Sequence, residues 1–151
     1  FEFIKNKGFN IFMNLERINQ REYYKNIYNS SVNLALPGVG EFTFRHLEIL
    51  GNCSFMICDK KINQLELPLP IKDGEHFITY ENHDDLLEKI KFFLKNQDLR
   101  SKIALSGRKQ LEKYYSPKSH GKILFKKIFN WKIYIIIFDR MVRKKILTEI
   151  F

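Results

Sequence analysis

A glycine-containing turn separates two patterned segments of the chain, and its residue types are suited to chemistry. Pro37, Gly38 and Gly40 end an apolar run at Val32–Leu36, and a helical pattern begins after them at Phe42. The first turn of a helix presents unpaired backbone N–H groups at its positive end, which favours an anion such as phosphate. Because Gly38 and Gly40 lack side chains, the backbone can approach phosphate closely, so the turn is a candidate phosphate site.

Three polar side chains follow this turn at positions from which they can act on one ligand. Thr43 offers a hydroxyl, and Arg45 offers a forked, permanently charged group that matches phosphate. Glu48 lies three residues beyond Arg45, so both project from neighbouring positions on the helix surface. A carboxylate there suits the paired hydroxyls of a ribose, and the set therefore indicates a nucleotide site.

Each residue of this set also has a purely structural interpretation, and at this level both stay open. A glycine turn after a strand is commonly only a turn, and PxGxG differs from the dinucleotide fingerprint GxGxxG. Arg45 and Glu48 can form an i, i+3 ion pair on a solvated face, while Glu41 can simply favour the first helical turn. The convergence of these residues on one strand-turn-helix junction is what favours the functional interpretation.

The elements that must position the turn alternate between strand and helix. Short apolar runs predict strands, and apolar residues at helical spacing predict helices. The predicted strands are Asn10–Leu15, Val32–Leu36 and Ser54–Cys58, and the predicted helices are Arg21–Tyr28 and Phe42–Gly51, the latter with Phe44, Leu47 and Leu50 on one stripe. This alternation is typical of βαβ units and a parallel sheet.

The following part of the chain adds one strand and then a run of helices. In order, the pattern predicts a turn at Asp73-Gly74, a strand at His76–Tyr80, a helix capped by Asn82, a helix from Asn96 to about Tyr115, and a further helix from Ser116-Pro117. We therefore expect an α/β fold with a Rossmann-like parallel sheet, flanking helices and a helical C-terminal tail.

Length and composition limit the class of protein. With 151 residues, 44% of them hydrophobic, one domain with a real core is expected and a disordered chain is excluded. The longest apolar run, Ile133–Phe138, is too short to span a bilayer.

The chain opens with Phe1 and no leader pattern follows, so we expect no signal peptide and a piece of a longer protein. A cytoplasmic location is expected, with attachment to a membrane surface as the alternative.

The cysteines and histidines do not predict a metal site. Cys53 and Cys58 bracket an apolar run instead of forming a close CxxC pair, so two buried, reduced thiols are expected. The four histidines show no HxxxH or HxH spacing that would place two imidazoles around one ion. We therefore expect no metal and no cofactor.

The net charge of +9 belongs mostly to the end of the chain. Residues 1–115 hold 17 basic and 15 acidic groups, whereas residues 116–151 hold 9 basic groups against Asp139 and Glu149. This tail interleaves lysine and arginine with large apolar residues and Trp131, a pattern typical of a helix on an anionic membrane surface. The alternative is that its apolar positions pack on this domain or on a partner domain. Nucleic acid is not expected as a partner, because the basic residues match no recognition module.

The stretch from Ser31 to Cys58 resembles the nucleotide-sugar half of two-domain glycosyltransferases of the GT-B fold. The shared order is a strand, the PGVGE turn, the TFRHLE helix and a short buried strand, as in the group-one and the CgeB-like or exostosin-like branches. Further similar segments are Leu69–Ile78 with Tyr80, Leu86–Ile90, Ile103-Ala104, Gly107-Arg108 and Tyr115–Pro117. The resemblance covers about residues 10–130 and implies a Rossmann-like donor-binding domain at 1–117, half of a GT-B architecture, followed by the basic tail at 118–151.

The resemblance implies transfer of a sugar from a nucleotide-activated donor to a glycan, lipid or protein acceptor. By that analogy Glu48 binds the donor ribose, and the residues around the diphosphate are Gly38, Gly40, Thr43 and Arg45. Arg45 would stabilise the negative charge that grows as the nucleotide leaves. Glu41 is the candidate contact to the donor sugar, and it lies one residue closer to Glu48 than the paired glutamates of retaining members do. Glu41 and Arg45 are therefore the candidate catalytic residues.

Three hypotheses follow for the function. The first is a glycosyltransferase domain that binds a nucleotide-sugar and is inactive without a missing N-terminal domain, which supplies acceptor contacts and any general base. The second is a non-catalytic nucleotide-binding α/β module. The third is an adaptor that binds a membrane surface or another polyanion through the basic tail. The strand-turn-helix junction and the resemblance favour the first.

Overall fold

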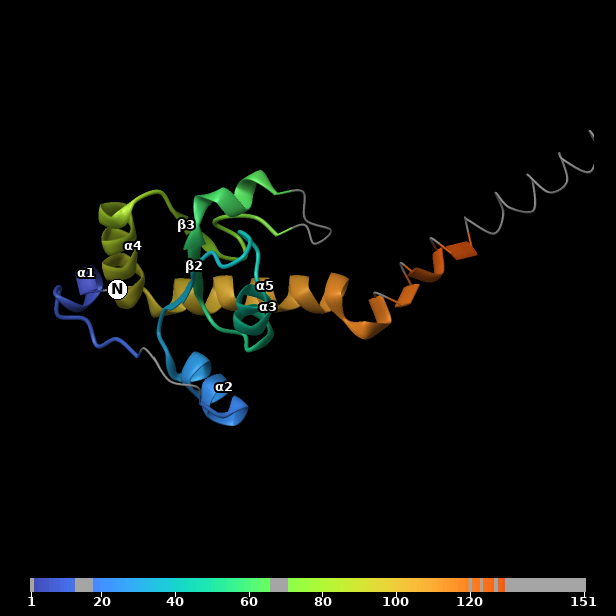
Figure 1. The fold of residues 1–151 in the computed structure, drawn as a ribbon, viewed down its shortest axis with the longest axis horizontal. Helices are drawn as coiled ribbons and strands as arrows, with labels where there is room; N and C mark the ends of the chain where they lie inside the picture. The colour runs from blue at the N-terminus through green and yellow to red at the C-terminus, as the bar shows by residue number, and fades with distance from the viewer. Residues whose placement is uncertain are drawn as a thin grey trace, which may run out of the picture. The chain divides into compact units, whose positions relative to one another are not determined.

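The alternation of short apolar runs with amphipathic segments folds into a parallel sheet flanked by helices in a computed structural model of the chain (Figure 1). The structure describes residues 2–12, 18–65 and 71–119, together with residues 121, 122, 124–126, 128 and 129. The chain divides into two units, Phe1–Glu112 and Lys113–Phe151. The predicted α/β class with a Rossmann-like parallel sheet is confirmed, and the predicted boundary after residue 117 stays a prediction.

From the second helix onward the strands and α-helices follow the predicted order, whereas the 3-10 helix after the second strand was not predicted. The elements are α1 (Glu2–Lys5), α2 (Gln20–Asn29), β1 (Asn33–Ala35), α3 (Phe44–Gly51), β2 (Met56–Asp59), the 3-10 helix η1 (Lys60–Gln64), β3 (Ile78–Tyr80), α4 (His83–Lys95) and α5 (Gln97–Tyr115). Asparagine side chains cap two of the helices: Asn19 accepts a hydrogen bond from the Glu22 N–H at 2.9 Å, and Asn82 accepts from two N–H groups of α4 at 3.0 Å.

Strand β2 is the centre of the sheet, with β1 and β3 parallel to it on either side. In this register Leu34 lies opposite Ile57, and Ile57 lies opposite Ile78. Because successive side chains of a strand point to opposite faces, Phe55 and Ile57 supply one face, and Met56 and Cys58 supply the other. The near-continuous apolar sequence of this strand is therefore explained by burial on both sides.

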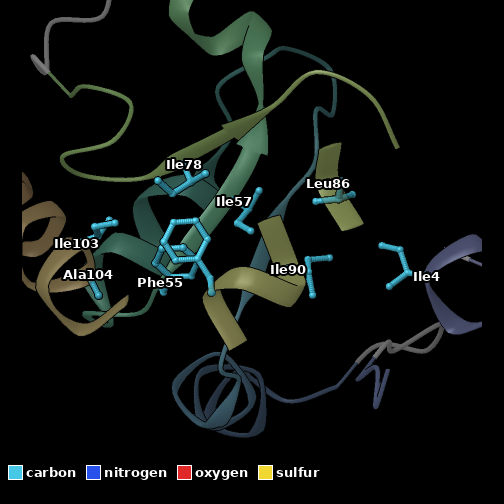
Figure 2. Packing of buried hydrophobic residues seen from close by; sticks show 9 residues of the cluster. Ile4, Phe55, Ile57, Ile78, Leu86, Ile90, Ile103 and Ala104 are labelled. Atoms are coloured by element: carbon cyan, nitrogen blue, oxygen red, sulfur yellow. The ribbon is translucent and has the colours of Figure 1, made fainter. Parts of the chain in front are cut away.

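Each face of the sheet is covered by its own cluster of buried residues. On the Ile57 face the cluster consists of Ile4, Phe55, Ile57, Ile78, Leu86, Ile90, Phe93, Ile103 and Ala104 (Figure 2). On the other face it consists of Ile27, Ala35, Ile49, Leu50, Met56, Cys58, Ile62 and Phe77. Helix α4 thus covers one face, and α2 and α3 cover the other, which is the layered arrangement of an α/β fold.

Helix α5 contributes to both clusters. Ile103 and Ala104 belong to the first cluster, and Leu111 packs against the second. Gly107 lies between these residues in the sequence, and its backbone is very close to Leu50 and His76. A Cβ on Gly107 would lie 2.6 Å from Leu50 Cδ2 and 2.7 Å from the backbone oxygen of His76. The absence of a side chain at this position therefore allows α5 to lie directly on the neighbouring elements.

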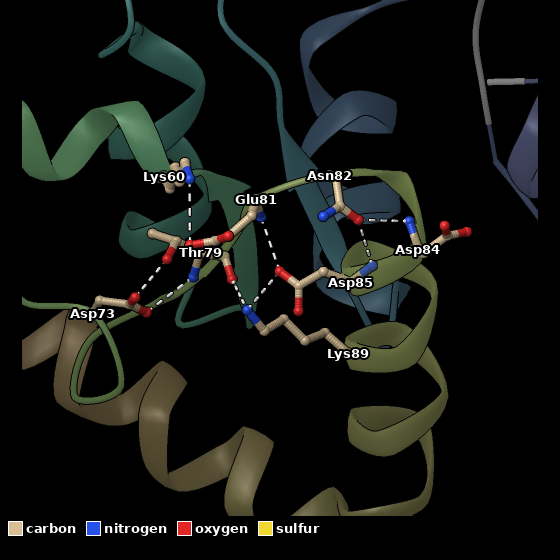
Figure 3. A network of polar contacts seen from close by, with 8 residues as sticks. All are labelled: Lys60, Asp73, Thr79, Glu81, Asn82, Asp84, Asp85 and Lys89. Atoms are coloured by element: carbon tan, nitrogen blue, oxygen red, sulfur yellow. Dashed lines mark hydrogen bonds and ion pairs between the residues drawn. The ribbon is translucent and has the colours of Figure 1, made fainter.

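A polar network fixes the path of the chain around β3 and into α4 (Figure 3). The carboxylate of Asp73 accepts hydrogen bonds from the N–H of Thr79, at 2.9 Å, and from its hydroxyl. The ammonium of Lys89 donates to the Thr79 carbonyl at 2.7 Å and to Asp85 Oδ2 at 2.8 Å. The predicted turn at Asp73-Gly74 therefore leads into β3 as expected, and polar groups of this partly buried strand are satisfied.

The predicted strand at Asn10–Leu15 is wrong where it can be judged. Residues 10–12 are irregular, and the rest of the predicted strand lies outside the described residues. Ile11 instead packs, half-buried, against the cluster on the Ile57 face. An apolar side chain can be buried by such a contact without backbone pairing, whereas a β-strand also requires a neighbouring strand.

Two details of α3 also differ from the prediction. The helix begins at Phe44 instead of Phe42, because Thr43 takes the N-cap position. Its buried face is formed by His46, Ile49 and Leu50, whereas Phe44 is 83% exposed. The predicted stripe is confirmed at Leu50 and wrong at Phe44 and Leu47, since the helix is rotated so that these two border an open hollow instead of the core.

The turn after α3 corrects the prediction for one of the two cysteines. Cys58 is buried as predicted, and burial raises the pKa of its thiol far above its ordinary range. Cys53 is exposed and has a φ of 55°, the left-handed conformation that commonly ends a helix. Both cysteines are free thiols.

In the second unit the described residues between 117 and 129 are helical. The hydroxyl oxygen of Ser116 accepts a hydrogen bond from the Ser119 N–H at 3.1 Å, so the predicted helix start at Ser116-Pro117 is confirmed. Trp131 and Ile133–Phe138 lie outside the described residues. Within the described part of the chain, no helix is long and apolar enough to cross a bilayer.

Candidate functional site

The glycine turn connects the fully buried Ala35 at the end of β1 to the N-cap of α3. Within the turn, the Gly38 N–H donates a 3.0 Å hydrogen bond to the Gly40 oxygen. A Cβ on Gly38 would lie 3.3 Å from Thr43 Cγ2, so the turn folds back closely onto the start of the helix. A Cβ on Gly40 would meet no atom within 4 Å, so the backbone at Gly40 borders open space from which a ligand can approach.

Thr43 and His46 cap the N-terminus of α3. The Thr43 N–H donates a 3.0 Å hydrogen bond to His46 Nδ1, and Thr43 Oγ1 lies 3.2 Å from the same nitrogen. This is the arrangement of a capping box, with histidine at the position usually held by Glu or Gln. The N–H groups of Phe44 and Arg45 have no backbone partner in the described part of the chain, so they stay available at the positive end of the helix.

His46 is neutral in this cap. Its side chain is 1% exposed, and burial is the main reason that its pKa lies below the ordinary value of 6.5. The charge of Arg45 acts in the same direction, against an opposing contribution from the Thr43 backbone. Because Nδ1 accepts the hydrogen bond from Thr43, the imidazole proton belongs on Nε2. The helix end therefore carries no charge of its own apart from the nearby Arg45.

Glu48 is held in place by a tyrosine from a different helix. The hydroxyl of Tyr23 in α2 donates a 2.8 Å hydrogen bond to Glu48 Oε2 in α3. Burial is the largest cause of a raised pKa at Tyr23, and the hydrogen bond with Glu48 and its charge raise the pKa further. Arg45 acts on the same hydroxyl and lowers this pKa, so the guanidinium lies close to the pair.

The ion pair considered for Arg45 and Glu48 is not formed in the structure. The ion pairs of the described residues do not include an Arg45–Glu48 pair, although the two lie on the same side of α3. Glu48 is bound by the neutral Tyr23 instead, and Arg45 is exposed. The guanidinium of Arg45 therefore does not form an ion pair with the carboxylate of Glu48.

Glu48 also borders an open hollow of about 470 Å³ on the surface of α2 and α3. Its lining consists of Tyr24, Phe44, Leu47, Glu48, Gly51 and Asn52. Phe44, the first residue of α3, is the lining residue that directly follows the cap. An aromatic and aliphatic wall with one carboxylate at its edge suits a flat, partly polar ligand.

Glu41 lies at the far end of the turn and is partly buried. Its Oε2 atom is enclosed by protein and has no hydrogen-bond partner among the described residues. A buried carboxylate oxygen without a partner is costly, which is a common feature of sites that bind a hydroxyl or another donor from a ligand. Within the described part of the chain no hydrogen bond or ion pair connects Glu41 with the Tyr23–Glu48 pair.

Two residues of this site were not identified from the sequence. Tyr23 lies within the predicted helix Arg21–Tyr28 and was given no role in the site, although the hydroxyl of a buried tyrosine needs a partner and so signals a polar contact. His46 stands three residues after Thr43, and this spacing could have indicated the capping box. The roles predicted for Gly38, Gly40, Thr43, Arg45, Glu41 and Glu48 toward a ligand stay predictions.

Comparison with known proteins gives one match. A family model described as glycosyl transferase-like matches residues 6–126. This range contains all three strands, the glycine turn, and the helices that carry Tyr23, Arg45 and Glu48. No curated protein and no solved structure gives a significant match to the chain.

Proposed function

Because the chain belongs to the glycosyl transferase-like family, we propose that the junction of β1 and α3 binds a nucleotide-activated sugar and presents it for transfer. The proposed architecture is the donor-binding half of a GT-B enzyme, of the group-one or the CgeB-like or exostosin-like branch. The observation that carries the proposal is the position of Glu48. Its carboxylate is held by Tyr23, lies near Arg45, and lines the hollow on α2 and α3.

In this proposal Glu48 binds the ribose of the donor. Tyr23 occupies Oε2, which leaves Oε1 to accept a hydrogen bond from a ribose hydroxyl. The carboxylate rotates little because its partner comes from a separate helix, so the acceptor is positioned before the ligand arrives. The aromatic rings of Tyr24 and Phe44 in the hollow then provide the surface against which the base lies.

The diphosphate binds at the start of α3. The N–H groups of Phe44 and Arg45 point out of the first helical turn, and the open backbone at Gly40 permits close approach. The Arg45 guanidinium adds a full positive charge beside these dipoles. Thr43 contributes to the same region as the cap: its hydroxyl lies 3.2 Å from His46 Nδ1, and its methyl group faces Gly38.

The reaction breaks the bond between the anomeric carbon of the sugar and the diphosphate oxygen, and forms a bond from that carbon to an acceptor hydroxyl. Negative charge grows on the leaving diphosphate, and Arg45 with the helix N–H groups stabilises it. Glu41 contacts a hydroxyl of the donor sugar once its carboxylate turns out of the enclosed position in which Oε2 has no partner among the described residues. A second, N-terminal domain supplies the acceptor site and any general base, so this chain alone binds donor without turnover.

The test is a calorimetric titration of the chain with ADP, GDP, UDP and dTDP, and then with sugar esters of the nucleotide that binds. Glu48→Ala should weaken that nucleotide about 10-fold to 100-fold, because a hydrogen bond to a charged group is lost. The matched control is Glu88→Ala, which removes an exposed carboxylate from α4. Unchanged affinity in Glu48→Ala would show that the ribose assignment is wrong.

A second arm separates transfer from binding alone. When the chain is joined to a GT-B N-terminal domain of the same branch, Arg45→Gln should lower the rate of transfer more than it lowers donor affinity. This difference is expected because the charge that Arg45 stabilises is largest in the transition state. Donor binding without transfer in every such pairing would favour a non-catalytic nucleotide-binding module.

A further inference from the structure

The helical segment after Pro117 exposes large apolar side chains. We call its described residues from 117 to 129 the tail helix. Their exposed fractions are 59% for Leu124, 62% for Phe125, 57% for Ile128 and 46% for Phe129. Four large apolar residues exposed within six positions form a continuous surface, which is unusual for a surface that contacts only water.

These side chains follow the spacing of one side of a helix. Leu124 and Ile128 are four residues apart, as are Phe125 and Phe129, and residues at this spacing are neighbours on a helix surface. The rings of Phe125 and Phe129 confirm this arrangement, since their centroids are 4.0 Å apart. The apolar residues therefore form one stripe along the tail helix.

Lysines form a second stripe beside the first. Lys118, Lys122 and Lys126 recur every four residues, and all three side chains are exposed. The charge is not balanced locally, because residues 116–151 contain 9 basic residues and only Asp139 and Glu149 as acidic ones. The partner of this surface must therefore bury the apolar stripe and also present negative charge to the lysines of the same helix.

We propose that the tail helix binds the surface of a membrane that contains anionic lipids, with its axis in the plane of the interface. The apolar stripe enters the boundary between headgroups and acyl chains, and the flanking lysines extend their ammonium groups to the lipid phosphates. Nucleic acid would satisfy the lysines but not the aliphatic side chains of Leu124 and Ile128. This surface lies outside the proposed donor site and does not depend on sugar transfer.

The test is flotation of the whole chain with vesicles of phosphatidylcholine that contain one third phosphatidylserine. Binding is expected to these vesicles and to be about tenfold or more weaker to pure phosphatidylcholine. The double substitution Phe125→Ser and Phe129→Ser should abolish flotation while the thermal unfolding curve of the chain stays unchanged. The matched control is Phe92→Ser, which removes a ring of 53% exposure from α4 and should leave flotation intact.

A charge series provides the independent measurement. Replacing Lys118, Lys122 and Lys126 by Gln should weaken binding about tenfold and reduce its dependence on salt. Replacing the exposed Lys91, Lys95 and Lys102 by Gln changes the net charge equally and should have little effect. The proposal is overturned if the aromatic double variant floats like the parent chain, if both lysine sets act alike, or if the chain binds an oligonucleotide but not the anionic vesicles.

Discussion

The hydroxyl of Tyr23 donates a hydrogen bond to Glu48 Oε2 at 2.8 Å and so joins helix α2 to helix α3. The two residues lie 25 positions apart in the sequence, on helices that cover the same face of the sheet. Because the bond reaches the carboxylate from outside its own helix, the direction of the carboxylate is set by tertiary packing. A ligand that depends on Glu48 is therefore sensitive to a change at Tyr23.

Removal of this hydroxyl should weaken nucleotide binding. In Tyr23→Phe the carboxylate of Glu48 loses its partner, so the affinity for the bound nucleoside diphosphate should fall about 3-fold to 10-fold, and the unfolding free energy by about 1 kcal/mol. Calorimetric titration and urea unfolding measure the two effects. Tyr28→Phe alters an exposed tyrosine of the same helix and should change neither value. A loss of stability with unchanged affinity would mean that the pair serves only the fold.

The two glycines of the turn should respond differently to alanine. Gly40→Ala should keep the unfolding free energy within about 0.5 kcal/mol, because the new Cβ meets no atom within 4 Å. It should weaken a nucleoside diphosphate but not the corresponding nucleoside, since the added methyl group blocks only the approach of phosphate. In Gly38→Ala the Cβ meets Thr43 Cγ2 at 3.3 Å, so stability and binding should both fall. Equal binding of the diphosphate by Gly40→Ala and the parent chain would place the phosphates elsewhere.

Substitution of Glu41 should separate stability from recognition of the sugar. In Glu41→Gln an enclosed carboxylate without a partner becomes a neutral amide, so the unfolding free energy should rise or stay the same. Affinity for the nucleotide-sugar should fall toward that of the nucleoside diphosphate, because the sugar loses its acceptor. Paired titrations with the two ligands measure this difference. If the variant still prefers the nucleotide-sugar by the same factor, Glu41 does not contact the sugar.

Two buried histidines should make the fold sensitive to mild acid. The pKa values of His46 and His76 lie below the ordinary value of 6.5, mainly because both side chains are buried. Below pH 6.5 the unfolded chain therefore binds more protons than the folded chain, so the unfolding free energy should fall as the pH drops from about 7 to 5.

Glutamine at either position isolates the contribution of each histidine to this pH dependence. His46→Gln keeps an acceptor for the Thr43 N–H but cannot be protonated, so its stability curve should be flatter between pH 7 and about pH 5. His76→Gln should flatten the curve in the same direction, because its Nδ1 also accepts a backbone hydrogen bond, from Lys72 at 2.9 Å. The exposed His83→Gln is the control. A parent curve that is level across this range would contradict the neutral state of both buried rings.

An added methyl group at Gly107 should destabilise the first unit. In Gly107→Ala the Cβ would lie 2.6 Å from Leu50 Cδ2 and 2.7 Å from the His76 backbone oxygen, and backbone cannot move aside cheaply. The expected loss is about 1–3 kcal/mol, despite the better helix propensity of alanine. Urea unfolding measures it. Gly121→Ala has the same propensity gain and no atom within 4 Å of the new Cβ, so this control should not lower stability.

The sequence was sufficient to predict the sheet and most of its connections, because those depend on local patterns. After Ser54 the run Phe55–Cys58 is apolar at every position, and burial of β2 on both faces explains this pattern. The rotation of α3 about its axis could not be predicted, because Phe44 and Leu47 fit a core stripe as well as His46 and Ile49 do.

Only the residues of the candidate site that lie close together in the sequence could be predicted. Gly40, Arg45 and Glu48 were identified because a turn and one helix bring them together within a few residues. The contribution of Tyr23 depends on how α2 packs beside α3, and no spacing within either helix indicates it. The irregular course of residues 10–12 was missed for a related reason, since a strand needs a neighbour that the local pattern does not show.

The position of α5 across both clusters has a consequence for how the chain folds during synthesis. All three strands have been made once Tyr80 is added, but neither cluster is complete at that point. One still lacks Leu86, Ile90 and Phe93 of α4 as well as Ile103 and Ala104 of α5, and the other lacks only the contact with Leu111. A ribosome must therefore release α4 and most of α5 before both clusters are complete, so part of the apolar surface of the strands remains open to chaperones until those helices emerge.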